Sequence, residues 1–194
     1  FHKPVTEFQG TFGMPNMSTL KTILGIDEYA SDAVITVKQD AVKGPVSMNF
    51  LNKAGDFTND YSCMTKEIVE DQLKTVKFKG VSWHVELEPS MASIQRLKYQ
   101  AMANSNESTF LAKTEDGNLV FYFGDHSTHA GNFVFAHDVV GDLKRSWHWP
   151  IAHVINILSL PGDKVLRFSD DGAAQIIVDS GMAEYTYILP AQSK

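Results

Sequence analysis

Apolar residues at helical spacing, each time followed by three short apolar-rich stretches, recur three times along the chain. The first copy begins with apolar residues three or four positions apart, which predict a short amphipathic helix: Met17, Leu20, Ile23 and Leu24. Strands are expected after this helix at residues 34–37, 46–51 and 60–64. The pattern therefore predicts one small module that is used repeatedly.

The middle and last copies keep this order of one helix and three strands. The middle copy has a longer predicted helix, at residues 89–104, and its strands fall at 109–113, 118–123 and 132–136. The sequence Glu-Asp-Gly-Asn at 115–118 predicts a hairpin turn between the first two of those strands. In the last copy the strands fall at 165–168, 173–178 and 185–189, and the helix is marked by Ile151, Val154, Ile155 and Leu158.

Each module has one apolar helix face and one apolar sheet face, which a single module cannot bury. Modules must therefore pair, and the predicted fold is α+β, with helices packed on antiparallel sheets. The middle and last modules make one pair, whereas only 16 residues precede Met17 of the first module. We expect either that a further module of about 30 residues is missing, so that the first domain is N-terminally truncated, or that a short strand at 7–12 takes its place.

The best candidate for a domain boundary is the segment Lys-Thr-Val-Lys-Phe-Lys-Gly at residues 74–80. Its three lysines alternate with other residues and the segment closes on glycine, which is typical of a linker. An edge strand protected by lysines is a compatible interpretation. The expected organisation is an incomplete domain at 1–74, a linker at 75–80 and a second domain at 81–194.

Charge and composition narrow the possible functions. The net charge is −6, so any binding to nucleic acid must use a local basic patch rather than a generally basic surface. No apolar run approaches the roughly 18 residues of a membrane span, and residues 1–10 lack the basic and apolar regions of a signal peptide. The single cysteine, Cys63, cannot form an internal disulfide, which favours a reducing compartment.

Five histidines within residues 126–153 are the strongest hint of enzymatic chemistry: His126, His129, His137, His148 and His153. A metal-dependent enzyme is conceivable, but the histidines lack the helical His-x-x-x-His spacing or cysteine pairs that accompany metal sites. No Gly-x-Ser-x-Gly turn or phosphate-binding glycine loop is present either. We therefore expect a protein that is not an enzyme and holds no cofactor or metal, with the histidine-cluster enzyme as an alternative.

Three stretches, at residues 16–24, 88–98 and 153–190, resemble the DNA sliding clamps, most closely the trimeric polymerase processivity factors of large tailed bacteriophages. The first reads Asn-Met-Ser-Thr-Leu-Lys-Thr-Ile-Leu, and the second reads Glu-Pro-Ser-Met-Ala-Ser-Ile-Gln-Arg-Leu-Lys. The third ends in Tyr-x-Tyr-x-x-Pro, which is similar to the end of other clamps. The resemblance covers nearly the whole chain and depends on order and spacing rather than on one signature motif.

The resemblance implies a DNA clamp fold with two modules in each domain and two domains in each protomer. It implies a homotrimeric ring, lined by helices and walled by sheets, that encircles duplex DNA without sequence preference. Such a ring tethers the replicative DNA polymerase and confers processivity, is opened by a clamp loader, and works in the cytoplasm of an infected bacterial host. A structural oligomer of the virion, built from the same module, is a further alternative.

A clamp needs a few mobile cationic contacts with phosphate on its helices. On a regular helix Arg96 lies opposite the apolar face, whereas Lys98 falls within that face and must reach to its rim unless the helix is distorted. Lys21 lies at the edge of the first helix's apolar face. The candidate DNA contacts are Lys21, Arg96, Lys98, Lys144, Arg145 and His153. Of these, Lys144 and Arg145 belong to a segment at 144–150 that we expect to be a loop anchored by its tryptophans.

Partners of sliding clamps present a short peptide to an apolar groove beside the linker and the C-terminal strand. The positions of this chain that match the groove are Val76, Phe78, Tyr187, Leu189 and Pro190. Because strand residues alternate between faces, an equally good interpretation is that Tyr187 and Leu189 face the core.

Overall fold

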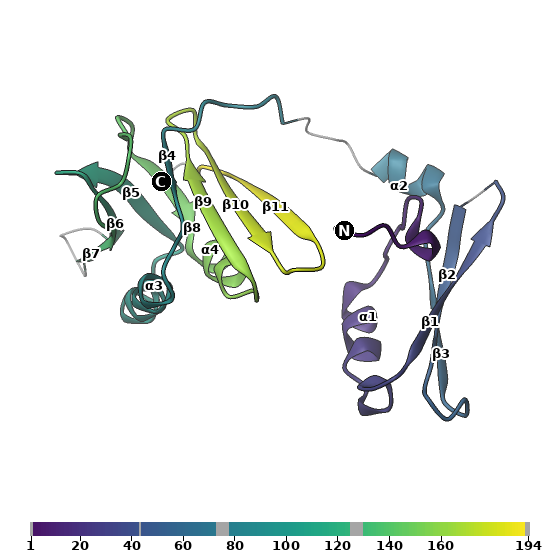
Figure 1. Cartoon of the computed structure of the whole chain (residues 1–194). Coiled ribbons are helices and arrows are strands. Elements are labelled where there is room, and N and C mark those ends of the chain that lie inside the picture. Colours follow the sequence, from purple (N-terminus) through teal and green to yellow (C-terminus); the bar gives the residue numbers. More distant parts are fainter. Residues whose placement is uncertain (1, 43, 73–77, 125–129, 193–194) are drawn as a thin grey trace. The chain divides into compact units, whose positions relative to one another are not determined.

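The structure is a computed structural model that describes residues 2–42, 44–72, 78–124 and 130–192 (Figure 1). The chain forms two compact units: one spans Pro4–Phe78, and the other combines Phe1–Lys3 with Lys79–Lys194. We call them the small unit and the large unit. The described chain passes between the units at Pro4 and at Lys79, and residues 75–77 of the expected linker lie outside the described residues.

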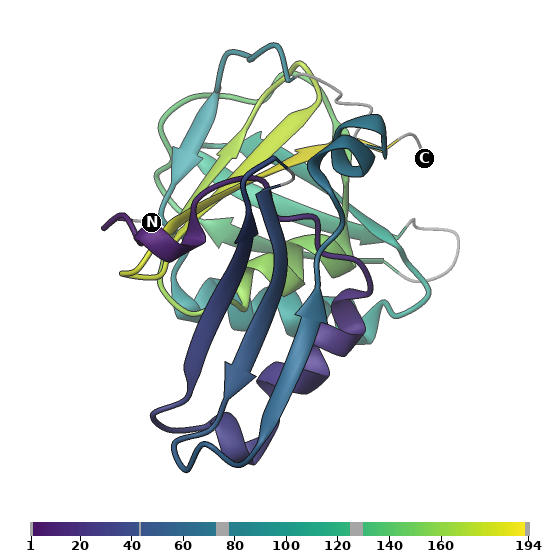
Figure 2. The same cartoon turned by 90° about the vertical axis from the view of Figure 1, so that its right-hand side faces the viewer.

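The small unit contains the first module. Helix α1 (Met17–Leu24) lies along one face of a three-stranded antiparallel sheet, as Figures 1 and 2 show. The strands are β1 (Val34–Asp40), β2 (Gly44–Leu51) and β3 (Thr58–Ser62), in the order β1-β2-β3. The expected helix and three strands are therefore confirmed. Short helices η1 (Thr6–Phe8), η2 (Asp27–Tyr29) and α2 (Lys66–Gln72) complete the unit, and α2 was not anticipated.

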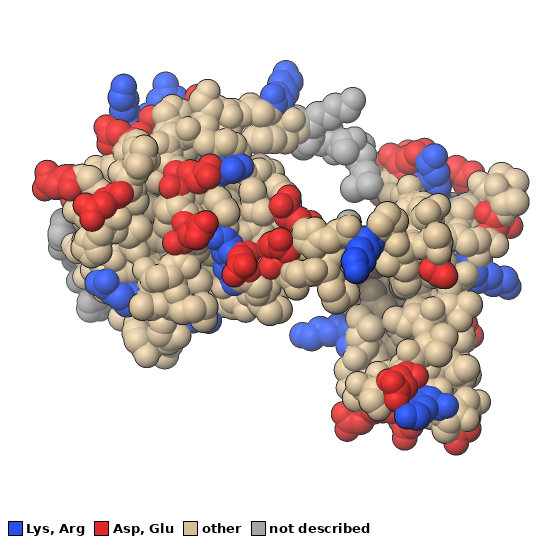
Figure 3. Space-filling model, viewed as in Figure 1, with Lys and Arg blue, Asp and Glu red and all other residues tan. Residues whose placement is uncertain are grey.

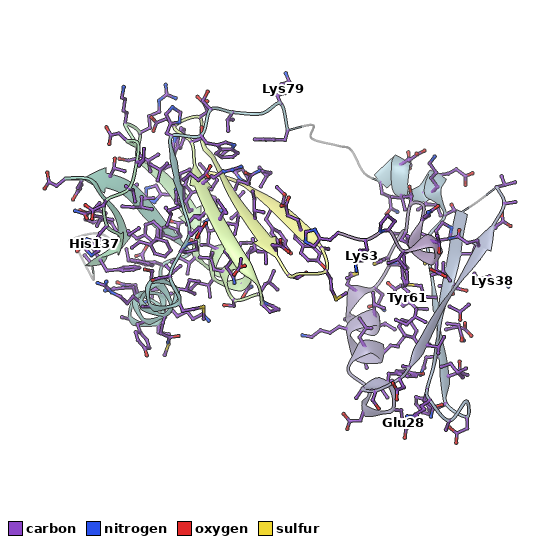
Figure 4. All side chains as sticks on the ribbon, viewed as in Figure 1. Lys3, Glu28, Lys38, Tyr61, Lys79 and His137 are labelled. Atoms are coloured by element: carbon purple, nitrogen blue, oxygen red, sulfur yellow. The ribbon has the colours of Figure 1, made fainter. Side chains whose placement is uncertain are left out.

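The core of the small unit lies between α1 and the sheet. It is formed by the side chains Leu20, Ile23, Met48, Phe50 and Tyr61. Tyr61 points from β3 toward α1 (Figure 4), and its hydroxyl donates a hydrogen bond to the carbonyl oxygen of Pro15. Burial is the main cause that raises the pKa of this phenol, and the nearby Cys63 raises it further. The hydroxyl therefore stays protonated and keeps the segment before α1 attached to the sheet.

Two expectations for the small unit are wrong. Met17 and Leu24 are each 58% exposed rather than buried. No strand forms at residues 7–12: Thr6–Phe8 is a 3-10 helix, and Gly10, with φ +112, interrupts the extended run. The chain instead makes a single bridge from Gly13 to Met64, where an added Cβ would meet Val69 Cγ2 at 2.5 Å.

The large unit contains the middle and last modules, and both are confirmed. The middle module is α3 (Met91–Ala103), β5 (Thr109–Glu115), β6 (Asn118–Gly124) and β7 (Ala130–Ala136). The last module is α4 (Ile151–Leu158), β9 (Asp163–Phe168), β10 (Ala173–Asp179) and β11 (Glu184–Pro190). One further short strand precedes each helix: β4 (Val85–Leu87) before α3 and β8 (Trp147–Pro150) before α4.

These two short strands are exchanged between the modules. Strand β8 pairs with β5, which gives the middle sheet the order β7-β6-β5-β8, and β4 pairs with β9, which gives the last sheet the order β11-β10-β9-β4. Each helix therefore follows a strand that belongs to the other module's sheet. The exchange joins the two modules into one domain.

A single core joins both sheets and both helices of the large unit. Phe110 and Phe121 pack with ring centroids 4.4 Å apart, and Leu97 of α3 is 0% exposed. Phe121 also contacts Phe168 of the last sheet edge to face, with centroids 6.1 Å apart. One cluster contains residues of all the strands of the large unit, β4 and β8 included. Neither module can therefore be removed without exposing the apolar surface of the other.

Two expectations for the large unit need correction. Helix α3 begins at Met91 rather than at residue 89, because Ser90 caps it by accepting a hydrogen bond from the backbone N–H of Ser93. Met91 itself is 76% exposed and is not part of the apolar face. The segment at 144–150 is not wholly a loop, because Trp147–Pro150 is strand β8. Its anchoring by tryptophan is confirmed, since Trp149 is 1% exposed.

Candidate nucleic-acid interface

The three module helices share one electrostatic property: they contain no carboxylate. The chain has 23 acidic residues, and none of them lies within Met17–Leu24, Met91–Ala103 or Ile151–Leu158. The same helices carry Lys21, Arg96, Lys98 and His153. All of the acidic charge of a chain with net charge −6 therefore lies outside these helices.

Arg96 is exposed and lies on the side of α3 that faces β7. Its guanidinium carbon is 5.2 Å from the centre of the Phe133 ring, within the range of a cation–π interaction. Together with Tyr99, Gln100 and Asn132 it lines a hollow of about 380 Å³. The Phe133 ring holds the guanidinium in position without neutralising its charge, so Arg96 can still bind an anion.

Lys98 follows the fully buried Leu97 and is itself half-buried. Helix α3 is continuous from Met91 to Ala103, so the alternative of a distorted helix is wrong. The aliphatic part of a half-buried lysine covers apolar surface while its ammonium group stays in water. This arrangement keeps the positive charge of Lys98 at the surface of the helix.

Helix α4 packs beside α3 and presents polar residues to solvent. His153 and Asn156 are exposed, whereas Val154 is 1% exposed and faces the core. The chain enters this helix through Pro150, the residue that precedes its first turn. The fold therefore brings Arg96, Lys98 and His153 onto two neighbouring helices.

Lys21 lies in the small unit, in the last turn of α1, where the helix dipole favours a cation. Its side chain is exposed. Ser18 and Thr22 give this helix a polar side, since the Ser18 hydroxyl binds Asn16 Oδ1 and the Thr22 hydroxyl donates to the Ser18 carbonyl.

Lys144 and Arg145 lie outside the module helices, in the connection from β7 to β8. Their backbone N–H groups both donate to the carboxylate of Asp170, at 3.2 Å and 3.0 Å. Asp170 is 9% exposed, and its carbonyl oxygen accepts from the Trp147 indole at 2.8 Å. Its own N–H donates to His84 Nδ1 at 3.2 Å. The two cationic side chains thus project from a backbone that Asp170 fixes.

Sequence reasoning missed the role of Asp170. The pair Asp170-Asp171 looks like ordinary turn charges, and nothing local distinguishes the buried carboxylate from the exposed one. The available signal was its position two residues after the buried end of β9, in the turn that ends at Gly172, whose φ is +78.

The histidines do not form a metal site among the described residues, where no group of three or more histidine, cysteine or acidic side chains could hold an ion. His137 Nδ1 lies 2.8 Å from Asn118 Oδ1, and His148 Nδ1 lies 3.5 Å from the Thr109 hydroxyl. His126 and His129 lie outside the described residues.

In the part of the chain that is described, no helix is long and apolar enough to cross a membrane.

The candidate groove residues differ in accessibility. Phe78 is 46% exposed and Pro190 is exposed, whereas Leu189 is 8% exposed and belongs to the core of the large unit. Tyr187 is half-buried against the same core. Val76 lies outside the described residues. Phe78 and Pro190 are thus accessible to solvent, while Tyr187 and Leu189 face inward.

Paired modules of one helix and three strands, joined by exchanged strands, are the architecture of the DNA clamp fold, and this chain has that fold. Among solved structures, the chain is similar to the crystal structure of PCNA from Thermococcus kodakaraensis, with a TM-score of 0.60. The match covers 91% of this chain and 71% of the PCNA chain at 11% identity, so the likeness shows the fold. No family model matches the chain. No curated protein matches it either.

Proposed function

We propose that this chain is the subunit of a ring-forming sliding clamp that encircles duplex DNA and tethers a DNA polymerase. The observation that carries the proposal is the charge division: the module helices hold cations and no carboxylate in an acidic chain. Duplex DNA offers a dense row of phosphates. A helical surface of this kind attracts that row, while the acidic remainder of the protein repels it.

The arrangement also fits sliding rather than reading of sequence. Lys21 lies on α1, whereas Arg96 and Lys98, two residues apart on α3, point to different sides of that helix, so the three do not form a set that could bind one base pair bidentately. Contacts to phosphate fix no register along DNA. Few contacts keep each step along the duplex easy, whereas a closed ring makes dissociation slow.

Self-association is supported by the open edge of strand β7. Edge strands in proteins usually carry charges or proline that prevent pairing with another sheet. Strand β7, Ala-Gly-Asn-Phe-Val-Phe-Ala, has neither, and among the described strands it pairs only with β6. The exposed Tyr99 of α3 lies next to this edge. A neighbouring protomer would satisfy this edge, and a homotrimer is the ring that the resemblance implies.

The partners of such a ring would be a replicative polymerase and a clamp loader, as in the tailed bacteriophages, within the cytoplasm of an infected bacterium. Lys144 and Arg145 complete the candidate DNA contacts at a fixed turn. Phe78 and Pro190 are the exposed candidates for an apolar contact with partner peptides.

We also propose that the small unit is an incomplete clamp domain, since it holds one module where the large unit holds two.

The solution mass tests the proposal. Sedimentation equilibrium at several concentrations is expected to show a species of three times the 21.6 kDa chain mass. A charged substitution on the open edge, Val134→Lys, is expected to reduce that species, whereas Thr36→Lys on strand β1 serves as the matched control. A monomer at every concentration would contradict ring formation by this chain.

A further inference from the structure

Carboxylates gather at one end of the last sheet. Asp179 of β10 is paired directly with Asp163 of β9 and with Glu184 of β11. These three and Glu88, which follows β4, line a hollow of about 430 Å³. Figure 3 shows acidic side chains over β9, β10 and β11. Because like charges directly opposite each other destabilise a sheet, this end of the sheet favours a cation.

The chain places its own residues there. The backbone N–H of His2 donates to the Met182 carbonyl at 2.8 Å, and His2 Nε2 lies 2.7 Å from Asp179 Oδ1. Asp179 Oδ1 also accepts from the Gly181 N–H at 2.8 Å, so the hairpin turn and the histidine share one carboxylate oxygen. These contacts lie within the large unit, to which residues 1–3 belong.

We propose that His2 is a pH-dependent clip: its imidazolium holds residues 2–3 on the β10–β11 turn, and loss of its proton weakens the attachment. Histidine is the side chain that ordinarily changes charge between about pH 5 and pH 8. The charged groups around the clip are mostly acidic. They are the acids Asp163, Asp179, Glu184 and Glu88 and the cations Lys3 and Lys164.

The nearby lysines do not replace the histidine. Lys164 Nζ donates to the Gly162 carbonyl at 2.6 Å, which directs that ammonium group to the backbone. Lys3, labelled in Figure 4, is the next residue after His2 and adds positive charge to the same segment. The hydrogen bond from His2, followed by the Gly181 N–H, holds the pKa of the Asp179 carboxyl below its usual value.

The clip has a consequence for the connections of the chain. The polypeptide leaves residues 2–3 at Pro4, where the small unit begins, and returns to the large unit at Lys79. The clip therefore acts on the segment that directly precedes the small unit. The inference is independent of the proposed DNA-binding function.

Amide hydrogen exchange of His2 tests the clip, with rates corrected for their intrinsic dependence on pH. In the wild-type protein we expect the protection of the His2 N–H to fall about two- to five-fold when the imidazole is deprotonated, the range of an exposed ion pair. His2→Gln and Asp179→Asn are expected to remove this pH dependence. His137→Gln is the control, because His137 pairs with Asn118 and not with the clip.

Equal protection of the wild-type amide above and below the titration of the imidazole would overturn the proposal. So would a pH dependence that persists in His2→Gln. An NMR titration of the Asp179 carboxyl gives a second readout: in His2→Gln its pKa is expected to rise toward the ordinary value, with the Gly181 N–H still lowering it in part. A carboxyl pKa that does not move in this variant would show that His2 is not docked.

Discussion

Replacing Asp170 tests how the two modules of the large unit are fastened. This 9% exposed carboxylate accepts backbone hydrogen bonds from Lys144 and Arg145, next to the exchanged strand β8. In Asp170→Asn one oxygen remains, but the new amide group turns an N–H toward one of the two backbone donors. That donor loses its acceptor.

The expected cost follows from the loss of one hydrogen bond to a charged group and a buried donor without a partner. Together these give about 2 kcal/mol for Asp170→Asn. Asp170→Ala removes both acceptors and is expected to cost about 3–4 kcal/mol. With a urea dependence of about 1–3 kcal/mol per molar, the unfolding midpoint of Asp170→Asn should fall by about 1 M.

The assay uses the intrinsic fluorescence of the large unit, because all three tryptophans of the chain, Trp83, Trp147 and Trp149, lie there. Urea unfolding followed by this signal therefore reports the large unit alone. The matched control is Asp171→Asn, which makes the same chemical change at the adjacent exposed position. If Asp170→Asn unfolds within about 0.5 kcal/mol of the wild-type protein, or no earlier than Asp171→Asn, the carboxylate does not fasten the modules.

Three further outcomes are expected. Leu97→Ala should lower the free energy of unfolding by about 2–5 kcal/mol, because Leu97 is 0% exposed, whereas Met91→Ala, at a 76% exposed site on the same helix, should change it little in the same urea assay. Arg96→Ala should reduce the slope of log K for duplex DNA binding against log salt concentration by about one unit. The control Lys113→Ala removes a cation of β5 that lies over the Tyr122 ring of β6, and it should leave this slope unchanged. Equal effects of the two substitutions would show that Arg96 has no special role. The hydrogen bond to Glu115 raises the pKa of Tyr122 to about 12. The contribution of this hydrogen bond to stability is therefore fully present below about pH 10 and is lost as the pH rises from there to about 12. Glu115→Gln should bring the ultraviolet titration of this phenol to lower pH, and an unchanged titration would refute the assignment.

The modules could be predicted from the sequence because their patterns are local. Leu20 and Ile23, or Val154 and Leu158, lie one turn apart on the same helix face, and each strand run is bounded by turn residues. The same patterns do not tell which apolar residues find a partner. Met17, Leu24 and Met91 have the right spacing, yet more than half of each is exposed.

Contacts between distant segments decide the parts that could not be predicted. Strands β4 and β8 have three and four residues, too few for a periodic signal, and they are strands because β9 and β5 offer them edges. The candidate interface shows the same limit. Arg96 and His153 could be placed on exposed helix faces from spacing alone, whereas the position of Arg96 over Phe133 depends on the packing of α3 on β7.

Retention on circular DNA tests the central claim most directly. After incubation at high concentration with a nicked circular plasmid, the protein is separated from free protein by gel filtration in moderate salt, and half of the sample is cut once to make the DNA linear. A ring lined by Lys21, Arg96 and Lys98 is expected to stay on the circle and to slide off the linear molecule. Equal retention on both forms would mean that the protein holds DNA by surface contact, and no retention on either would mean that this chain does not encircle DNA.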